Sequence, residues 1–272
     1  MIKKITKITS VILLSSTLIT GSVIAKDNKN VNPHKDLNLP KNAYVVDYKE
    51  ADVTGDSVKD KIYLVGTKEN KEDIYASNLN IIIKNGKTKK LAKTESKDFG
   101  GYEGHLFIGD FTGDKVNDIL ATADTGGSGG IIENRIYTLD NDKINTIFNE
   151  KDNEGVDFKG KFVDGYKAEL KSEKINKEIT LDISGNKKDY IEGKIYDEKG
   201  KLLSQVEPYT HSYGALEPVQ YENGTYYLQG QQRIVGFANP DTLSNVRSVW
   251  KYENSKWVPV EVEYGTFLNL NK

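Results

Sequence analysis

The stretch DVTGDSVKD, residues 52–60, and its near copy DFTGDKVND, residues 110–118, decide the predicted fold. The copies begin 58 residues apart and agree at six of nine positions. In each, oxygen-bearing side chains occupy positions 1, 3, 5 and 9 around a glycine. A repeated pattern of this kind indicates two copies of one supersecondary unit.

The spacing of these oxygens is the one that a hard cation requires. Ca²⁺ takes six to eight oxygen ligands at about 2.3–2.6 Å, and a short loop supplies them when alternate residues turn inward. The predicted metal ligands are Asp52, Thr54, Asp56, the Val58 carbonyl and Asp60 in one loop, and Asp110, Thr112, Asp114, the Val116 carbonyl and Asp118 in the other. The predicted cofactor is therefore structural Ca²⁺ at two sites.

Two alternatives bear on these loops. An EF-hand has Gly at position 6 and Glu at position 12, whereas position 12 here is Tyr63 or Ala121, so this class is excluded. The other alternative is turn chemistry alone, because Asp and Thr side chains hydrogen-bond their own backbone and Gly supplies positive φ. We favour calcium because a turn does not in itself require the acid at position 9.

The segments around the loops predict strands. Residues 61–65 and 119–123 are short runs rich in apolar or β-branched residues, and no later window has a long helical period. Further strands are expected at residues 44–48, 79–83, 131–139, 190–196, 226–228, 246–252 and 257–264, most of them beside Asn-Gly, Asp or Gly turn signals. The predicted fold class is all-β. A weaker echo of the loop at residues 182–189 is interpreted as a turn.

In both copies, the loop Asp-x-Thr-Gly-Asp-x-x-x-Asp lies between two predicted strands. This arrangement resembles the FG-GAP or VCBS repeat of secreted and surface proteins, including the integrin α-chain propeller. The resemblance covers residues 43–140 and implies propeller-like repeats of antiparallel strands with calcium in the loops. The loop period would fit about four blades into residues 42–272. The motif fades after residue 150, so a propeller-like half followed by a β-sandwich half is the alternative.

The N-terminus predicts export. Residues 1–25 combine a basic start, an apolar run and the small-residue ending Val23-Ile24-Ala25, which is typical of a signal peptide cleaved after Ala25. Residues 26–41 are polar and predict a flexible leader. A secreted location would expose the protein to millimolar calcium, where loops with three carboxylates are adequate ligands.

Composition narrows the partners. The chain has 38 basic and 40 acidic residues and no cysteine, so no disulfide forms. Charges are mixed and no basic patch stands out, which argues against nucleic acid. No apolar stretch beyond residue 25 is long enough to span a bilayer. The expected partner is a protein or a glycan.

No motif predicts a catalytic residue. Gly126-Gly-Ser128-Gly-Gly130 matches the nucleophile elbow pattern, but that elbow needs a helix directly afterwards, and a strand is expected there. His34, His105 and His211 lack metal-ligand spacing and are interpreted as surface or strand-edge residues. Ligand contact by His211, which lies in a polar aromatic loop, is the less favoured alternative. Trp250 and Trp257 suit either a β core, which we favour, or sugar binding.

The predicted function is a secreted, calcium-stabilised binding or adhesion module. The alternative is an extracellular carbohydrate- or ester-active hydrolase on the same scaffold. A glycosidase would need two carboxylates facing each other across a cleft. The sequence does not nominate such a pair, so a non-enzyme is favoured.

Overall fold

The computed structural model describes residues 37–221 and 223–266. The described strands all belong to one compact unit, Asn38–Lys272, which is the larger of the two units of the chain. The predicted signal peptide, residues 1–25, lies outside the described residues, as does most of the predicted leader. In the described part of the chain, no helix has the length and apolar character needed to cross a membrane.

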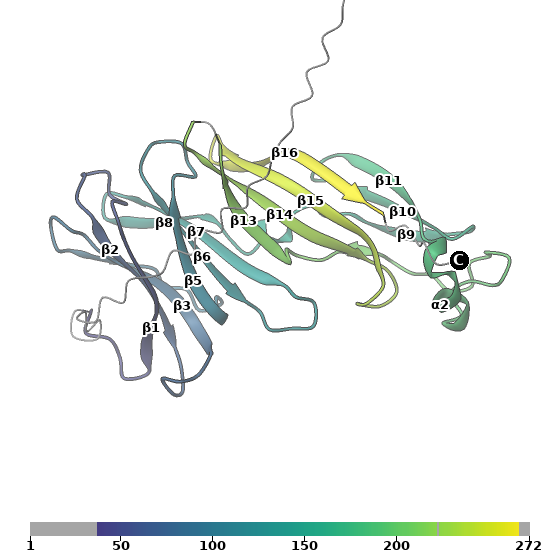
Figure 1. Cartoon of the computed structure of the whole chain (residues 1–272), viewed down its shortest axis with the longest axis horizontal. Helices are drawn as coiled ribbons and strands as arrows, with labels where there is room; N and C mark the ends of the chain where they lie inside the picture. Colours follow the sequence, from purple (N-terminus) through teal and green to yellow (C-terminus); the bar gives the residue numbers. More distant parts are fainter. Residues whose placement is uncertain (1–36, 222, 267–272) are drawn as a thin grey trace, which may run out of the picture. The chain divides into compact units, whose positions relative to one another are not determined.

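The first half of the larger unit is one antiparallel sheet with the order β1-β2-β3-β5-β6-β7-β8, and β4 pairs with β3 (Figure 1). Its strands are β1 (Ala43–Ala51), β2 (Asp60–Thr67), β3 (Tyr75–Lys84), β4 (Leu91–Lys93), β5 (Gly101–Gly109), β6 (Asp118–Asp124), β7 (Ile132–Asp140) and β8 (Lys143–Phe148).

The second half is another antiparallel sheet, with the order β11-β10-β9-β12-β14-β15-β16, and β13 pairs with β14. Its strands are β9 (Lys159–Val163), β10 (Lys167–Ser172), β11 (Lys177–Asp182), β12 (Tyr209–Thr210), β13 (Ala215–Gln220), β14 (Tyr226–Val235), β15 (Thr242–Glu253) and β16 (Lys256–Gly265). The helical segments between the described strands are short, namely η1 (Asp152–Glu154), η2 (Ser184–Asn186) and α2 (Lys187–Glu192).

Alternation of side chains explains these strands. In β10, Ala168, Leu170 and Ser172 are buried, whereas the residues between them are exposed. Successive side chains of a strand point to opposite faces, so this sequence covers a core with one face and meets water with the other. The all-β class is confirmed, with 52% of the residues in strands and 6% in helices.

The two motif-bearing repeats are β1-loop-β2 and β5-loop-β6. They do not form separate blades, because β3 pairs with β5 at Tyr75–Tyr102 and Ala76–Gly101 and joins them into one sheet. One of the two sheets curls into a half-barrel. The second sheet starts beyond residue 150, where the motif fades. The arrangement therefore fits the alternative of two different halves.

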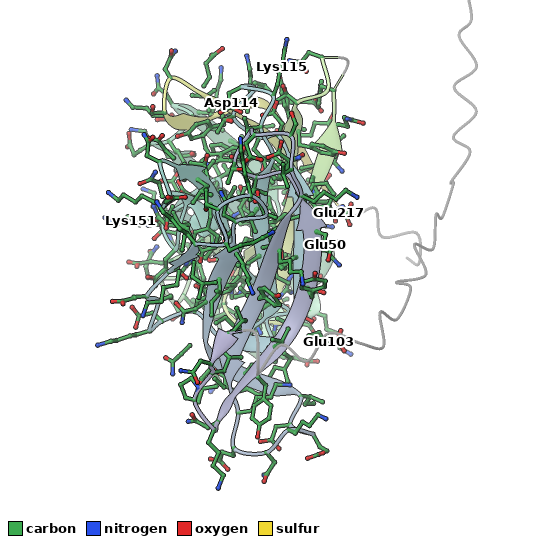
Figure 2. All side chains as sticks on the ribbon, turned by 90° about the vertical axis from the view of Figure 1, so that its left-hand side faces the viewer. Glu50, Glu103, Asp114, Lys115, Lys151 and Glu217 are labelled. Atoms are coloured by element: carbon green, nitrogen blue, oxygen red, sulfur yellow. The ribbon has the colours of Figure 1, made fainter. Side chains whose placement is uncertain are left out.

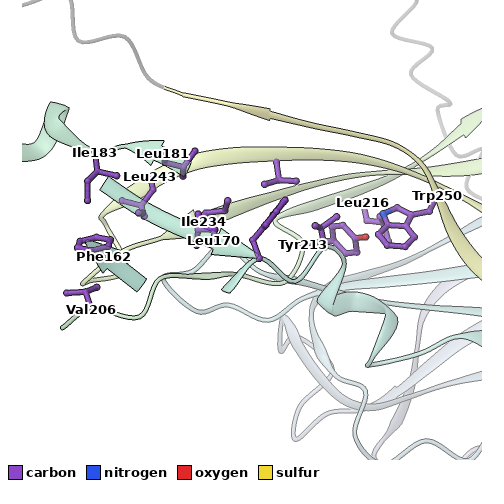
Figure 3. Packing of buried hydrophobic residues seen from close by; sticks show 14 of the residues in the cluster. Phe162, Leu170, Leu181, Ile183, Val206, Tyr213, Leu216, Ile234, Leu243 and Trp250 are labelled. Carbon is purple, nitrogen blue, oxygen red and sulfur yellow. The ribbon is translucent and has the colours of Figure 1, made fainter. Parts of the chain in front are cut away.

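Two clusters of buried side chains hold the unit together. One lies within the first sheet and includes Leu64, Leu79 and Ile119. The larger cluster joins the sheets, because Phe111 and Phe148 of the first half belong to it with the second-half residues shown in Figure 3, among them Phe162, Leu170, Tyr213, Ile234 and Trp250. The two halves thus share a core.

Trp257 makes the most direct connection between the halves. Its indole Nε1 donates a hydrogen bond of 2.7 Å to the Ile147 carbonyl, and its ring lies 6.2 Å from that of Phe111 and 5.6 Å from that of Phe148. Trp250 is 4% exposed. The prediction that these tryptophans serve the core is confirmed for both.

The strand predicted at residues 190–196 is wrong, because residues 187–192 form helix α2. Lys187, Lys188 and Asp189 are exposed, and Tyr190 is buried with its hydroxyl 3.0 Å from Asp241 Oδ1. A single buried aromatic residue after three exposed residues suits one turn of a helix. In a half-buried strand, buried and exposed side chains would alternate. The turn expected at residues 182–189 is the entry to this helix.

Phe111→Ala tests the shared core. We expect a loss of about 3–5 kcal/mol in the free energy of unfolding, since the substitution removes a fully buried ring. Because the core spans both sheets, the urea midpoint reported by tryptophan fluorescence in the second half should fall with it. Leu203→Ala is the control, because Leu203 is 60% exposed. Two separate transitions, with only one shifted, would contradict a shared core.

Candidate functional site

Position 1 of each Asp loop shapes the turn. Asp52 Oδ1 accepts from the Gly55 backbone N–H at 2.8 Å, and its Oδ2 accepts from Ser57 N–H at 2.7 Å. In the second loop, Asp110 Oδ1 accepts from Gly113 N–H at 2.6 Å and Oδ2 from Lys115 N–H at 2.9 Å. The copies therefore share a hydrogen-bond network as well as a sequence.

Position 6 shows what the turn demands of the backbone. Ser57 and Lys115 adopt φ of 66° and 71° there without being glycine, a conformation that is unfavourable for residues with a Cβ. The backbone N–H groups of these two residues are the donors to Oδ2 of Asp52 and Asp110. The hydrogen bonds made to the position 1 carboxylates thus offset the strain at position 6.

Position 9 holds the loop to the sheet. Asp60 is 0% exposed, and its carboxylate accepts from Val53 N–H at 2.9 Å and from Gly86 N–H at 2.8 Å. Asp118 is 1% exposed and accepts from the backbone N–H groups of Phe111 and Thr112, at 2.9 and 3.0 Å. The acid at position 9 thus has a structural use that the sequence pattern did not reveal.

Position 5 makes a single local bond in each loop. Asp56 Oδ1 accepts from Val58 N–H at 2.9 Å, and Asp114 Oδ1 accepts from Val116 N–H at 2.8 Å. Asp114 is exposed and lies at the end of the first sheet opposite to Glu103 (Figure 2). Carboxylates at this position contribute least to the loop itself.

Burial and hydrogen bonds act in opposite directions on the pKa of these acids. Burial raises the pKa of Asp52, but hydrogen bonds from Ser57, Gly55 and Thr54 outweigh it, so the pKa lies below its ordinary value. Burial raises the pKa of Asp118 to about 6, against the backbone bonds from Phe111 and Thr112. Carboxylates of the same loop pattern therefore have pKa values shifted in opposite directions.

The loops do not gather their acids around one point. Among the described residues, no group of three or more His, Asp or Glu is placed to hold a metal ion. The Thr54 and Thr112 hydroxyls donate to the position 1 carboxylates, at 3.3 and 3.5 Å. As the loops stand, these side chains fit turn formation rather than a calcium shell, and calcium binding stays a prediction.

The loops lie against each other. The Asn117 side-chain amide donates to the Asp52 carbonyl at 2.9 Å, and a Cβ at Gly55 would lie 2.9 Å from Cγ2 of Val116. Gly55 also has φ of 74°, so the turn and the close approach both require glycine. The second loop in turn meets the second sheet, since Tyr226 N–H donates to the Asp110 carbonyl at 2.7 Å.

A second candidate site is a cleft of about 580 Å³ on the second half. The strands β14, β15 and β16 form its floor, and two loops form its walls, the β6–β7 loop with Gly129 and Gly130, and the loop from His211 to Gly214. A Cβ at Gly130 or at Gly265 would meet no atom within 4 Å, so the backbone is open at these points.

Four polar side chains form the floor of this cleft. In the register of β14 and β15, Arg233 is opposite Asn245 and Gln231 is opposite Arg247. Residues two apart along a strand share a face, so these four side chains make one polar patch. Gln231 and Asn245 are exposed.

Arg233, His211 and Asn239 form a hydrogen-bonded cluster at one end of the cleft. Asn239 Oδ1 lies 2.9 Å from His211 Nε2 and accepts from an Arg233 Nη at 3.3 Å. Arg233 also donates to the Thr242 hydroxyl at 3.0 Å and to the Gly129 carbonyl at 3.3 Å. The cluster holds the arginine and the histidine in place and ties them to the glycine-rich loop.

Arg247 differs from Arg233 in having carboxylate partners. It forms ion pairs with Glu261 and with Glu263, the latter at 2.9 Å, and it donates to the Gln229 side-chain oxygen at 3.0 Å. Glu263 is the one carboxylate among the described residues that line the cleft.

Part of this site could be predicted from the sequence. The sequence favours a surface or strand-edge histidine at His211, with ligand contact as the less favoured alternative, and a connection between two strands at Gly126–Gly130. Residues of both segments line the cleft. The polar patch of Gln231, Arg233, Asn245 and Arg247 was missed. Polar side chains alternate along both strands, and this alternation indicates a polar face on each. The sequence alone does not show that the two strands are neighbours in the sheet.

We predict that Asp60→Ala costs about 2–4 kcal/mol of unfolding free energy, because two backbone N–H groups at a buried site lose their acceptor. Asp56→Ala removes one bond at the loop surface and should cost less than about 1 kcal/mol. Urea unfolding in EDTA measures both. Equal losses for the two variants would contradict a special role for position 9.

Comparison with known proteins identifies the family. Residues 156–265 match the family model of the YybI C-terminal domain. The chain is 32% identical over 209 residues to the uncharacterized protein YybI of Bacillus subtilis (strain 168), an alignment that covers 76% of this chain and 79% of that protein. A solved structure, of a Xanthomonas type IV secretion system related protein, is similar at 11% identity with a TM-score of 0.28, over 79% of this chain and 93% of that one.

These matches correct one expectation. The resemblance to FG-GAP or VCBS repeats is wrong, because no such family is found and the matching family is a different one. The nine-residue loop misled because its Asp and Thr side chains make the same local turn whatever the surrounding sheet. The chain belongs to the YybI family.

Proposed function

We propose that this chain is an exported, non-catalytic binding module of adhesion type, and that its ligand is a glycan that lies across the outer face of β14 and β15. The observation that carries the proposal is the polar patch of Gln231, Arg233, Asn245 and Arg247 on the floor of the cleft. Amide and guanidinium groups offer several hydrogen-bonding atoms in one plane, which suits ligands rich in hydroxyl groups.

An aromatic pair on the same sheet supports a long ligand. Tyr227 shares the strand and the face of Gln231 and Arg233, and its ring stacks on that of Tyr221 at 4.0 Å, with 21° between the planes. Tyr221 is 40% exposed. Arg233 lies six positions further along the strand than Tyr227, which corresponds to a distance of roughly 20 Å. A polymer would reach both ends of this face, whereas a single sugar would reach one.

The hydrolase alternative has less support. A glycosidase places two carboxylates across its cleft, whereas Glu263 in this cleft is paired with Arg247. For an esterase, the Ser128 hydroxyl would need a base, but its contact is the Asn239 side-chain amide at 3.3 Å, and strand β7 rather than a helix follows the loop.

Calcium binding at the two Asp loops belongs to the proposal on the strength of the sequence spacing. Calcium at about a hundred times its dissociation constant should stabilise the fold by roughly 2.7 kcal/mol per site. The double variant Asp56→Ala with Asp114→Ala should remove this gain. Thermal melting in CaCl₂ and in EDTA measures it. Equal melting temperatures of the parent in both would exclude these sites.

Binding is tested by sedimentation of the purified chain with isolated Gram-positive cell walls and by a glycan array. Gln231→Ala combined with Asn245→Ala should weaken binding about tenfold, since two hydrogen-bonding groups of the patch are lost. Gln205→Ala is the control, because Gln205 lies in the loop before β12 and lines a different pocket, with residues of β9, β10 and β11. If the control weakens binding as much as the double variant, the ligand does not lie in the cleft.

A further inference from the structure

Among the described residues, no carboxylate forms an ion pair with Arg233. Its four described hydrogen bonds all go to neutral oxygens, of Gly129, Asn239 and Thr242. The neighbouring Arg247, on the adjacent strand and the same face, has Glu261 and Glu263.

The location of this charge is as important as its sign. Arg233 lines the cleft with His211, and both are anchored on Asn239, so the cationic end is held in place before a ligand arrives. A group fixed in this way loses little conformational freedom on binding. Gly130 lines the same cleft, and a Cβ there would meet no atom within 4 Å, so the wall is open at this point.

We infer that the cleft selects a saccharide that carries an anionic group, a carboxylate or a phosphate, and that Arg233 recognises that group. This inference rests on the proposed function. The hydroxyl groups of the ligand would face Gln231 and Asn245, and the anionic group would lie at the Arg233 and His211 end. Charge-assisted hydrogen bonds to such a group are stronger than those between neutral partners.

Three probes of similar size separate the outcomes, namely glucose, glucuronate and glucose 6-phosphate. Chemical shifts of the backbone amides around the cleft, followed during NMR titration of the full chain at low salt, give the affinity of each. We expect at least one charged probe to bind about tenfold more tightly than glucose. The stronger of the two charged probes identifies the carboxylate or the phosphate as the preferred group.

Two substitutions test whether Arg233 is the cause. Asn245→Asp places a carboxylate directly opposite Arg233 in the strand register and should abolish the preference for the charged probes while Arg233 keeps its contacts. Arg233→Lys retains the charge and should retain the preference. Lys201→Gln is the matched control, because it removes a charge that is paired with Asp164 and does not line the cleft, and it should leave the preference in place.

The outcomes are distinct. Equal affinity for all three probes, or an anion preference that survives Asn245→Asp, overturns the inference. Absence of any shift with the charged probes overturns it as well. The proposed function is judged separately by the cell-wall and array experiments, so a neutral glycan that binds there and is weakened by the Gln231 and Asn245 variants would uphold the function while the selection by charge fails.

Discussion

Buried carboxylates that bind backbone N–H groups are the constraint on which the first half of the fold depends. Asp60 and Asp118 each open a strand and each accept from the backbone at the start of the preceding loop. A buried N–H group without a partner is costly, and a chain turning sharply between two strands presents several. A carboxylate with two oxygens satisfies two of them at once. In both loops these carboxylates accept from backbone donors, so the two copies form the same turn although the resemblance that they suggested is wrong.

The repeats and the second sheet depend on each other through aromatic packing. Phe111, the second residue of the second loop, has its backbone N–H held by Asp118 and its ring in contact with those of Tyr226 and Trp257. The first loop has Val53 at the equivalent position, which is buried within the first sheet instead. The larger side chain of Phe111 thus allows the second loop to pack on the second sheet, whereas Val53 of the first loop packs within the first sheet.

Strand content could be predicted well from the sequence, because period-two alternation is a local property, as in β10. The prediction failed at residues 190–196, where Tyr190 is fixed by Asp241, a partner 51 residues away. The same contrast between local patterns and partners distant in sequence applies to the cleft. His211 could be suspected from its own loop, but the importance of Arg233 comes from the partners that surround it after folding, and these are distant in sequence.

The different partners of Arg233 and Arg247 also affect which ligands the cleft would select. Arg233 and Arg247 have the same chemistry, the same face and adjacent strands, yet only Arg247 has carboxylates across the β15–β16 pairing, where Glu263 is its direct partner. An arginine with a paired charge orders the floor of the cleft, whereas an arginine with neutral partners keeps its attraction for an outside anion. The neutral partners of Arg233 come from separate segments, and within the described part of the chain its charge has no carboxylate partner, which a purely structural role would not require.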